Sequence, residues 1–284
     1  MTRKKKSICI FFILTFLIIS SCSTFTETRG KKARPQIIEK IGTFNEASIN
    51  ESSGIVKSRQ YKDIFWTHND SGNPPVLFAV DKHGKLINAF YVSHSSNVDW
   101  EDITIDDHNN LYIADMGDNI TLRNNLVIYK LKEPDPFSRI SNSTISEKIS
   151  VSYPKSKSDC EAIFWLQGRI YLVTKTSLGK TRLYMLDQSD KGQKKILHKI
   201  QDFSRIKEVT AADYSEQNRF LALLTYSEVV IMKAVSDKSI FTQFTRIPLS
   251  LKQSEAICWD RDDLVITNEE GELYRIRNLV FEKK

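Results

Sequence analysis

The sequence lacks the patterns that mark most nucleotide-binding and hydrolytic enzymes. Its 284 residues contain no phosphate-binding loop, no dinucleotide-binding glycine pattern and no glycine-flanked serine of the α/β-hydrolase kind. Only four cysteines and five histidines are present, and neither set is spaced like the ligands of a soft metal. No window shows a long helical period of apolar residues. These absences exclude the commonest catalytic signatures and leave an all-β chain as the expected fold class.

The chain also lacks an excess of basic residues once its first 35 residues are set aside. The formal net charge is +6, from 41 basic and 35 acidic residues. Eight of the basic residues but only one of the acidic residues lie before Gln36, so the remainder is close to neutral. A nucleic-acid-binding protein needs a basic stripe or patch. We therefore expect no nucleic-acid partner.

The N-terminus has the parts of a secretory signal. Arg3–Lys6 are basic, and Ile8–Ile19 form an apolar run that is short for a membrane span. The run ends in Ile19-Ser20-Ser21-Cys22, which resembles the lipobox of bacterial lipoproteins. That resemblance implies that residues 1–21 are a signal peptide and that Cys22 carries lipid, including palmitate. The alternative is an uncleaved or ordinary secretory signal with an incidental cysteine.

A lipid on Cys22 implies anchoring in the bacterial cell envelope. Because a serine follows the cysteine, we expect the outer membrane. Residues 22–35 are polar, basic and without apolar period, which predicts a flexible tether between the lipid and the folded domain.

Short acidic phrases recur along the rest of the chain. Each phrase has an acidic or hydroxyl residue, then a small or acidic one, then an apolar residue that opens a strand-like run. The apolar positions are Ile55, Ile103, Ile163, Ala212 and Ile257, at steps of 48, 60, 49 and 45 residues. A period in this range, with several strands per unit, is typical of a β-propeller blade.

Turn residues divide the repeats into short strands, which predicts five four-stranded blades over residues 36–284. The fifth repeat lacks its outer strand, whereas residues 37–44 form one strand too many. Pairing this N-terminal strand with the last blade closes the ring and leaves no open sheet edge. The longest repeat carries its additional residues in 132–143, an expected surface insertion. We expect a monomer in which Cys160 and Cys258 are buried or half-buried free thiols.

Polar residues of the repeats are expected to meet on one face of the disc. In each blade the innermost strand and the next run in opposite directions, so the start of one lies beside the end of the other. The strand starts carry Glu51, Asp99, Glu101, Asp159, Glu161, Glu208 and Glu255. Carboxylates in such a ring repel one another, which a bound cation or protonation would offset. The alternative is that each phrase only caps its own loop.

The predicted metal ligands are Asp99, Glu101, Glu161 and Glu255. Glutamate occurs at one register in three of the repeats, which loop capping alone does not require. Oxygen ligands from several loops suit a hard cation, and they suit Ca²⁺ better than Mg²⁺. The hypothesis is therefore a central Ca²⁺.

The loops after the second strands supply the predicted mouth of the channel. We expect them to place Asn69, Asp115, Asp118 and Asn119, together with Trp100, against a ligand. His68 and Asp70 are the candidates for a catalytic base. The alternative is that Asn, Asp and Gly simply form these turns and that Trp100, like the other three tryptophans, packs between blades. Arg123 and Lys175 are expected to be solvated surface residues, and the alternative is that they add positive charge for an anionic substrate.

The repeated Glu-Ala-Ile phrases and the Asp99–Ile103 segment resemble those of secreted bacterial propellers of unassigned function. The arrangement is also similar to two enzyme groups, the calcium-dependent apyrases and the gluconolactonase-like propellers. In this sequence Glu101, Glu161 and Glu255 match the acidic positions of the apyrases. This resemblance implies a divalent metal in the channel, although no full catalytic motif of either group is present. Two functions remain open. One is a lipid-tethered propeller that binds a ligand or partner, and the other is a metal-dependent hydrolase of a phosphate ester or lactone.

Overall fold

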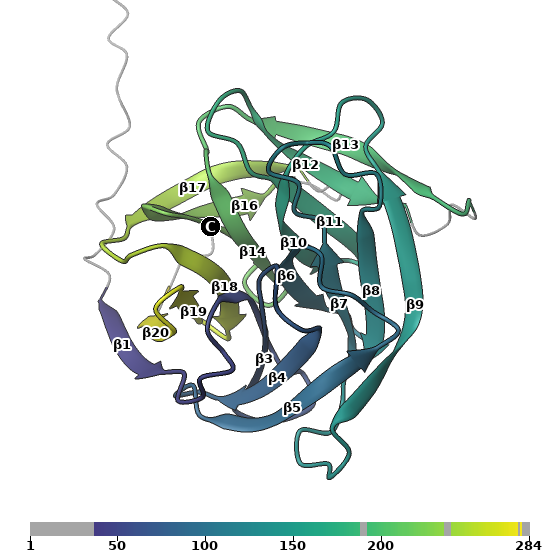
Figure 1. Cartoon of the computed structure of the whole chain (residues 1–284). Coiled ribbons are helices and arrows are strands. Elements are labelled where there is room, and N and C mark those ends of the chain that lie inside the picture. Colours follow the sequence, from purple (N-terminus) through teal and green to yellow (C-terminus); the bar gives the residue numbers. More distant parts are fainter. Residues whose placement is uncertain (1–36, 188–191, 236–239, 278, 280–284) are drawn as a thin grey trace, which may run out of the picture. The chain divides into compact units, whose positions relative to one another are not determined.

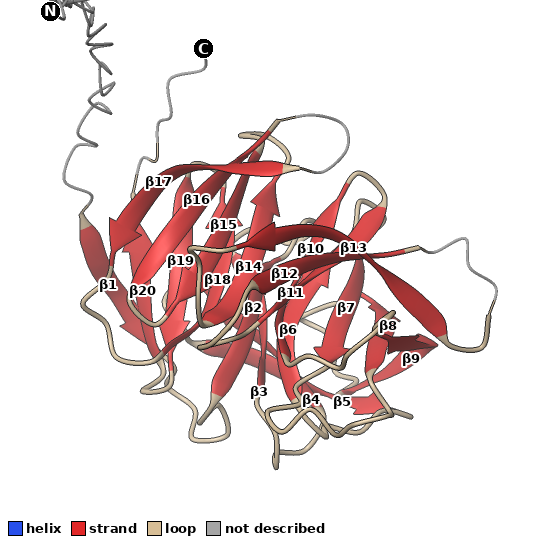
Figure 2. Ribbon diagram, turned by 90° about the horizontal axis from the view of Figure 1, so that it is seen from above, coloured by secondary structure: helices blue, strands red, loops and turns tan. Residues whose placement is uncertain are grey.

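The computed structural model describes residues 37–187, 192–235, 240–277 and 279, all within a compact unit that spans Pro35–Lys284. The predicted signal peptide, Cys22 and the tether lie outside the described residues. The described part contains strands and loops but no helix, as Figure 2 shows. It accordingly has no helix long and apolar enough to cross a membrane. The prediction of an all-β chain is confirmed.

Twenty strands pair as five antiparallel groups of four. The first two groups contain β2 (Ser52–Lys57), β3 (Ile64–Asn69), β4 (Val76–Asp81) and β5 (Leu86–Ser93), then β6 (Trp100–Ile105), β7 (Asn110–Asp115), β8 (Val127–Lys132) and β9 (Asn142–Ser152). The next two contain β10 (Cys160–Leu166), β11 (Arg169–Thr174), β12 (Thr181–Leu186) and β13 (Lys195–Phe203), then β14 (Val209–Ser215), β15 (Phe220–Thr225), β16 (Glu228–Ala234) and β17 (Phe241–Pro248). The last contains β18 (Ser254–Asp260), β19 (Asp263–Asn268), β20 (Glu272–Ile276) and β1 (Ile38–Thr43).

The fifth group is completed by the N-terminal strand. β1 pairs antiparallel with β20, from Ile38 opposite Ile276 to Thr43 opposite Glu272. Lys40 and Glu272 form an ion pair across these strands at 2.5 Å. Figure 1 shows β1, β5, β9, β13 and β17 around the outside and β6, β10, β14 and β18 near the middle. β1, the additional N-terminal strand of the prediction, therefore covers the edge of β20, which would otherwise be open.

The predicted insertion at 132–143 is mostly a loop between β8 and β9, but its last two residues belong to the long strand β9, which begins at Asn142. Its first residues pair in parallel with β5, with Asn142 opposite Tyr91. Its last residues pair in parallel with β13, with Val151 opposite Lys195. One 11-residue strand thus joins three groups into a continuous 12-stranded sheet. These pairings satisfy backbone groups that two outer strands would otherwise leave exposed.

Apolar side chains from neighbouring groups fill the space between them. Trp66 and Trp100 belong to one buried cluster, Trp165 packs in the next, and Trp259 packs between the last two groups. All seven residues of β10 are buried, which is the pattern of a strand covered on both faces. Cys160 and Cys258 are buried and free, as predicted. This packing fixes the innermost strands and hence the polar groups at their starts.

Candidate metal and ligand site

A β-bulge occurs at the same place in all five innermost strands. The register shifts between Ser52 and Gly54, Trp100 and Asp102, Cys160 and Ala162, Val209 and Ala211, and Ser254 and Ala256. The unpaired residues are Ser53, Glu101, Glu161, Thr210 and Glu255. A bulge leaves one residue outside the ladder and re-aims its side chain. The three glutamates that share a register in the sequence therefore share a local backbone feature in the fold.

These glutamates border one polar cavity of about 320 Å³. Its lining consists of Asn50, Glu51, Ser52, Ser53, Asp70, Glu101, Asn119, Glu161, Lys175, Tyr226, Glu255 and Glu269. Most of these residues stand at the starts of innermost strands or in the loops that follow second strands. The structure thus brings together the two sets of polar residues that the repeat pattern placed on one face.

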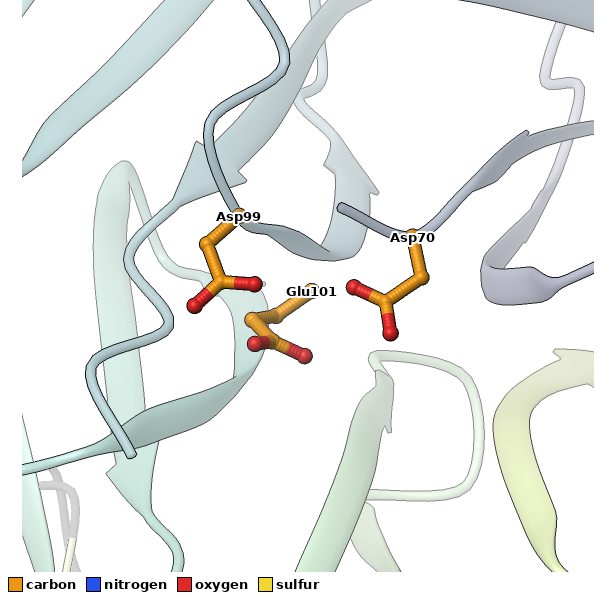
Figure 3. Close-up of side chains that lie close together, drawn as sticks. All are labelled: Asp70, Asp99 and Glu101. Atoms are coloured by element: carbon orange, nitrogen blue, oxygen red, sulfur yellow. The ribbon is translucent and has the colours of Figure 1, made fainter. Parts of the chain in front are cut away.

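Five carboxylates form two overlapping groups beside this cavity. In the first group, oxygens of Asp70, Asp99 and Glu101 lie within 4.8 Å of one another, and Figure 3 shows the three carboxylates converging. In the second group, oxygens of Glu101, Asp159 and Glu161 lie within the same distance. Glu101 is therefore common to both groups. The predicted ligand Glu255 borders the cavity but belongs to neither group.

Burial makes negative charge costly at this mouth. It raises the pKa of Glu161 to about 8 and that of Asp99 to about 6, and the nearby carboxylates of Asp159 and Asp70 add to the two shifts. Burial also raises the pKa of Glu255 to about 7. The pKa of Glu101 lies well above its usual range because of burial and repulsion by Glu161. A cation bound here would favour the charged forms instead.

Two basic residues, Lys175 and Arg123, adjoin the carboxylates. Both were predicted to be solvated surface residues, but both are largely buried. Lys175 Nζ lies 3.1 Å from Glu161 Oε2 and 5.3 Å from the centre of the Tyr226 ring. Although burial opposes its charge, Glu161 raises the pKa of Lys175. Arg123 is paired with Asp115 at 2.7 Å and its side chain is 14% exposed.

The remaining carboxylates of the two groups lack such partners. Among the described residues, Asp70, Asp99, Glu101 and Asp159 form no ion pair with a lysine or arginine. Their charge must therefore be offset by protonation or by a bound cation.

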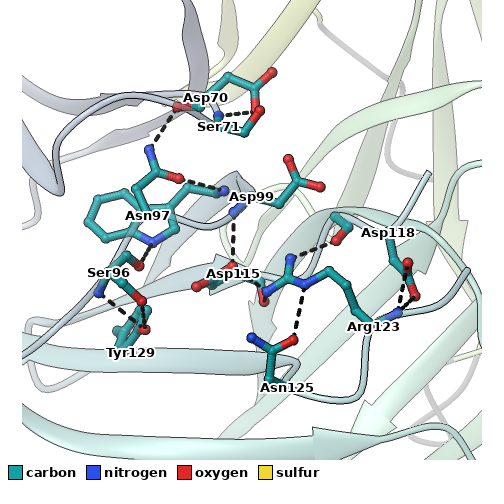
Figure 4. Close-up of polar contacts among 12 residues, drawn as sticks. Asp70, Ser71, Ser96, Asn97, Asp99, Asp115, Asp118, Arg123, Asn125 and Tyr129 are labelled. Atoms are coloured by element: carbon teal, nitrogen blue, oxygen red, sulfur yellow. Dashed lines mark hydrogen bonds and ion pairs between the residues drawn. The ribbon is translucent and has the colours of Figure 1, made fainter. Parts of the chain in front are cut away.

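The loop after β7 contains Asp115 and Asp118, which were predicted to contact a ligand. Their carboxylates instead hold the backbone of the site in place. Asp115 Oδ1 accepts the backbone N–H of Asp99 at 3.0 Å and the Arg123 guanidinium, as Figure 4 shows. The Asp118 carboxylate accepts the N–H groups of Leu122 and Arg123. Both aspartates are buried and shape the loop. Asn119 is exposed and does line the cavity.

Asn69 and Trp100, two further residues predicted at the mouth, hold the framework. The Asn69 amide donates to the carbonyl oxygen of Ser48 at 2.7 Å and to Asn50 Oδ1 at 2.9 Å. Trp100 has no exposed surface, and its Nε1–H donates to the Ser96 carbonyl oxygen. The prediction that Trp100 stacks on a ligand is therefore not met by its position, because packing between neighbouring groups buries the ring.

His68 is buried away from solvent, whereas Asp70 stands in the first carboxylate group. The His68 ring packs edge-to-face on Trp100 at 5.4 Å, and its Nδ1 lies 3.1 Å from the Asn69 carbonyl oxygen. Burial lowers the pKa of His68 to about 4. A general base must reach the proton that it removes. Zero exposure does not give His68 that access.

Two contributors to the site were not among the predicted ligands. Asp159 completes the second group, and its position beside Glu161 was visible in the sequence as part of an acidic phrase.

Gly117, the other contributor, leaves room for the carboxylates of the first group. A Cβ at Gly117 would lie 2.0 Å from Glu101 Oε1 and 2.4 Å from Asp99 Oδ2. A glycine in an acidic loop was the available signal, but only the fold shows which atoms it faces.

The donor set fits a hard divalent cation. All ligand atoms are carboxylate oxygens, the type that Ca²⁺ and Mg²⁺ prefer. Glu161 is 3% exposed, and in the described part of the chain its Oε1 has no hydrogen-bond partner. A buried polar atom without a partner is costly and calls for an explanation such as an ion. This orphaned oxygen and the cradle at Gly117 agree with cation binding.

No family model matches the sequence, and no curated protein matches it either. Among solved structures, the glutaminyl cyclase of Myxococcus xanthus is similar with a TM-score of 0.55 and 9% identity, over 85% of this chain and 96% of that chain. Virginiamycin B lyase from Staphylococcus aureus has a TM-score of 0.48 and 10% identity, over 84% of this chain and 98% of that one. Hydrazine synthase from Kuenenia stuttgartiensis has a TM-score of 0.44 and 11% identity, with 81% and 72% covered.

These similarities concern the fold alone. Propellers support many unrelated functions, and identities of 9–11% carry no information about activity. The cyclase match covers 85% of this chain and 96% of the cyclase, and the described strands pair as consecutive antiparallel groups. The chain is therefore an all-β protein with a β-propeller fold.

Proposed function

We propose that this protein is a lipid-anchored β-propeller of the cell envelope that holds Ca²⁺ at the mouth of its channel and binds a ligand or partner there. The observation that carries the proposal is the position of Glu101. Its carboxylate lies within 4.8 Å of those of Asp70 and Asp99 on one side and of Asp159 and Glu161 on the other. Its side chain is almost fully buried, so the cost of its charge must be offset locally.

The origin of the ligands favours Ca²⁺ over Mg²⁺. Asp70 follows β3, Asp99 precedes β6, and Asp159 precedes β10, so the carboxylates come from separate segments. Ca²⁺ accepts six to eight oxygens in flexible geometry, whereas Mg²⁺ demands near-ideal octahedral geometry and retains waters. A set gathered from several loops matches the less demanding ion.

Binding is favoured over hydrolysis by the surroundings of the carboxylates. A metal-dependent hydrolase needs a base near an open metal position. His68 is buried against Trp100 and does not border the cavity. Asp70 belongs to the carboxylate group itself. The cavity instead presents Lys175, Tyr226 and Asn119 around the acidic centre, which are groups that can orient a polar ligand.

The lipid anchor is proposed from the lipobox-like Ile19–Cys22 segment that follows the apolar run Ile8–Ile19. A diacylated cysteine supplies the two hydrophobic signals that stable anchoring requires. We expect the protein to partition into the detergent phase when bacterial membranes are extracted, and Cys22→Ser to move it to the aqueous phase. Equal partitioning of the two proteins would rule out lipidation of Cys22.

The cation is tested by thermal unfolding of the purified protein, first in EDTA and then in millimolar Ca²⁺ or Mg²⁺. A ligand that binds only the folded state, at about 100 times its dissociation constant, stabilises it by about 2.7 kcal/mol. For a domain of this size that is a rise of about 5–10 °C in the unfolding midpoint. We expect Ca²⁺ to give such a rise.

The rise should disappear in Glu101→Gln and persist in the matched variant Glu147→Gln, whose side chain is exposed on β9. An unchanged midpoint with both cations would refute the proposed metal. The acidic phrases would then be strand-start caps.

A further inference from the structure

We propose that the mouth holds two divalent cations, which share Glu101 as a bridging ligand. This inference rests on the proposed function, because it specifies how the same carboxylates bind Ca²⁺. The first position is formed by Asp70, Asp99 and Glu101, and the second by Glu101, Asp159 and Glu161.

The separation of the oxygens supports two positions. Ca²⁺–oxygen distances are about 2.3–2.6 Å, so two ligands of one ion lie at most about 5 Å apart. Within each group the oxygens lie within 4.8 Å of one another. Among the described residues, the five carboxylates do not form a single group at that distance. One ion therefore reaches either group but not all five carboxylates in this arrangement.

The second position has its own evidence for a missing partner. Glu161 Oε2 contacts Lys175 Nζ at 3.1 Å, whereas Oε1 has no hydrogen-bond partner in the described chain. The side chain is 4% exposed, so water does not readily serve this oxygen. Asp159 Oδ1 accepts the backbone N–H of Asp118 at 2.8 Å, which fixes the carboxylate beside Glu161.

The first position is shaped by backbone. Gly117 approaches the carboxylates so closely that a Cβ would overlap both Glu101 Oε1 and Asp99 Oδ2. The N–H groups of Met116 and Gly117 donate to the Asp99 carbonyl oxygen at 3.1 and 3.2 Å. This loop thereby holds Asp99 against Glu101, while Asp70 enters from the neighbouring group of strands (Figure 3).

The charge of the site also favours two ions. Five carboxylates face one contacting cation, the ammonium of Lys175. With all five carboxylates ionised, one divalent ion would leave a net charge of −2 among these groups, and two would leave none. Uncompensated charge in a partly buried site is strongly unfavourable. A bridging carboxylate such as Glu101 also reduces the repulsion between two neighbouring cations.

The test is the number of Ca²⁺ ions bound per chain, measured by isothermal titration calorimetry on the purified, EDTA-stripped protein with CaCl₂ as the only ligand. We expect two ions for the wild type. Asp70→Asn and Asp159→Asn each alter one group only, so each should reduce the number to one. Glu101→Gln should remove or greatly weaken both. The control Asp262→Asn, an exposed aspartate outside the site, should still bind two.

Each result bears on the proposal. One ion in the wild type would overturn the two-site arrangement and leave the proposed function intact. No binding would overturn both. Two ions that persist in Asp159→Asn or in Asp70→Asn would also overturn it, because the ions would lie elsewhere. Unfolding midpoints in EDTA identify any variant that fails to fold, and the wild-type stoichiometry decides the question without the variants.

Discussion

Gly117 shows how one residue without a side chain determines the geometry of the carboxylates. Its φ is outside the left-handed region, so backbone conformation does not require glycine at this position. The requirement comes from space, since the Glu101 and Asp99 oxygens occupy the volume of a Cβ. Glycine is the residue that permits such a close approach of backbone and polar atoms.

We expect Gly117→Ala to abolish the Ca²⁺-induced rise in the unfolding midpoint. The new methyl group must displace the Glu101 and Asp99 carboxylates, because its nearest atoms would lie at 2.0 and 2.4 Å. The unfolding midpoint of Gly117→Ala in EDTA should differ little from that of the wild type, since alanine tolerates this backbone conformation. Differential scanning fluorimetry with and without Ca²⁺ measures both quantities.

Gly168→Ala provides the opposite control. Gly168 has a φ of +79° in the turn between β10 and β11, and nothing lies within 4 Å of the added methyl group. Alanine there should lower the midpoint in EDTA through backbone strain, while the Ca²⁺-induced rise remains. A rise of normal size in Gly117→Ala would show that the two carboxylates do not bind the ion.

At the scale of elements, the strands could be predicted because each one is marked by a local sequence pattern, an apolar run between turn residues. The turn residues and apolar runs predicted five groups of four short strands with an N-terminal strand completing the last group, and the described strands pair in that way. The repeat spacing further predicted that Glu101, Glu161 and Glu255 face one cavity. Local period and repetition are sufficient for these features.

Contacts between groups of strands could not be predicted, because they depend on geometry that no local pattern encodes. Asp102 is the clearest case. Its Oδ1 accepts the N–H of Ile103 in β6, and its Oδ2 accepts those of Ile163 in β10 and Ala212 in β14, at 2.8, 3.0 and 3.3 Å. This buried carboxylate links three innermost strands that lie in different groups. The sequence shows only one more acid in the phrase Asp99–Asp102.

The same reasoning explains the outcomes for the mouth. Asp115 and Asp118 had the residue types of ligands, yet their oxygens are used by backbone N–H groups and by Arg123. Asp70 and Asp159 contribute to the carboxylate groups because their loops turn toward Glu101. Composition alone does not distinguish an aspartate that shapes a loop from one that faces a cavity.

At the scale of the whole molecule, the innermost strands of different groups meet at one cavity, which keeps their carboxylates close. Burial raises the pKa of Asp99 to about 6, that of Glu255 to about 7 and that of Glu161 to about 8. A raised pKa means that the folded state binds protons more tightly than the unfolded state. Stability from these groups is therefore present at low pH and is lost as the pH rises through 6–8.

In EDTA, we accordingly expect the unfolding midpoint to fall by several degrees between pH 5 and pH 8. With saturating Ca²⁺ the ion takes the place of the protons, so the fall should be reduced or absent and the two curves should separate as the pH rises. The range begins at pH 5 because carboxyls with lowered pKa values remain ionised there, such as Glu272 at about 2 beside Lys40. Thermal unfolding followed by circular dichroism at four pH values measures both curves. Curves that stay parallel across this range would mean that protons and Ca²⁺ do not compete for the same carboxylates.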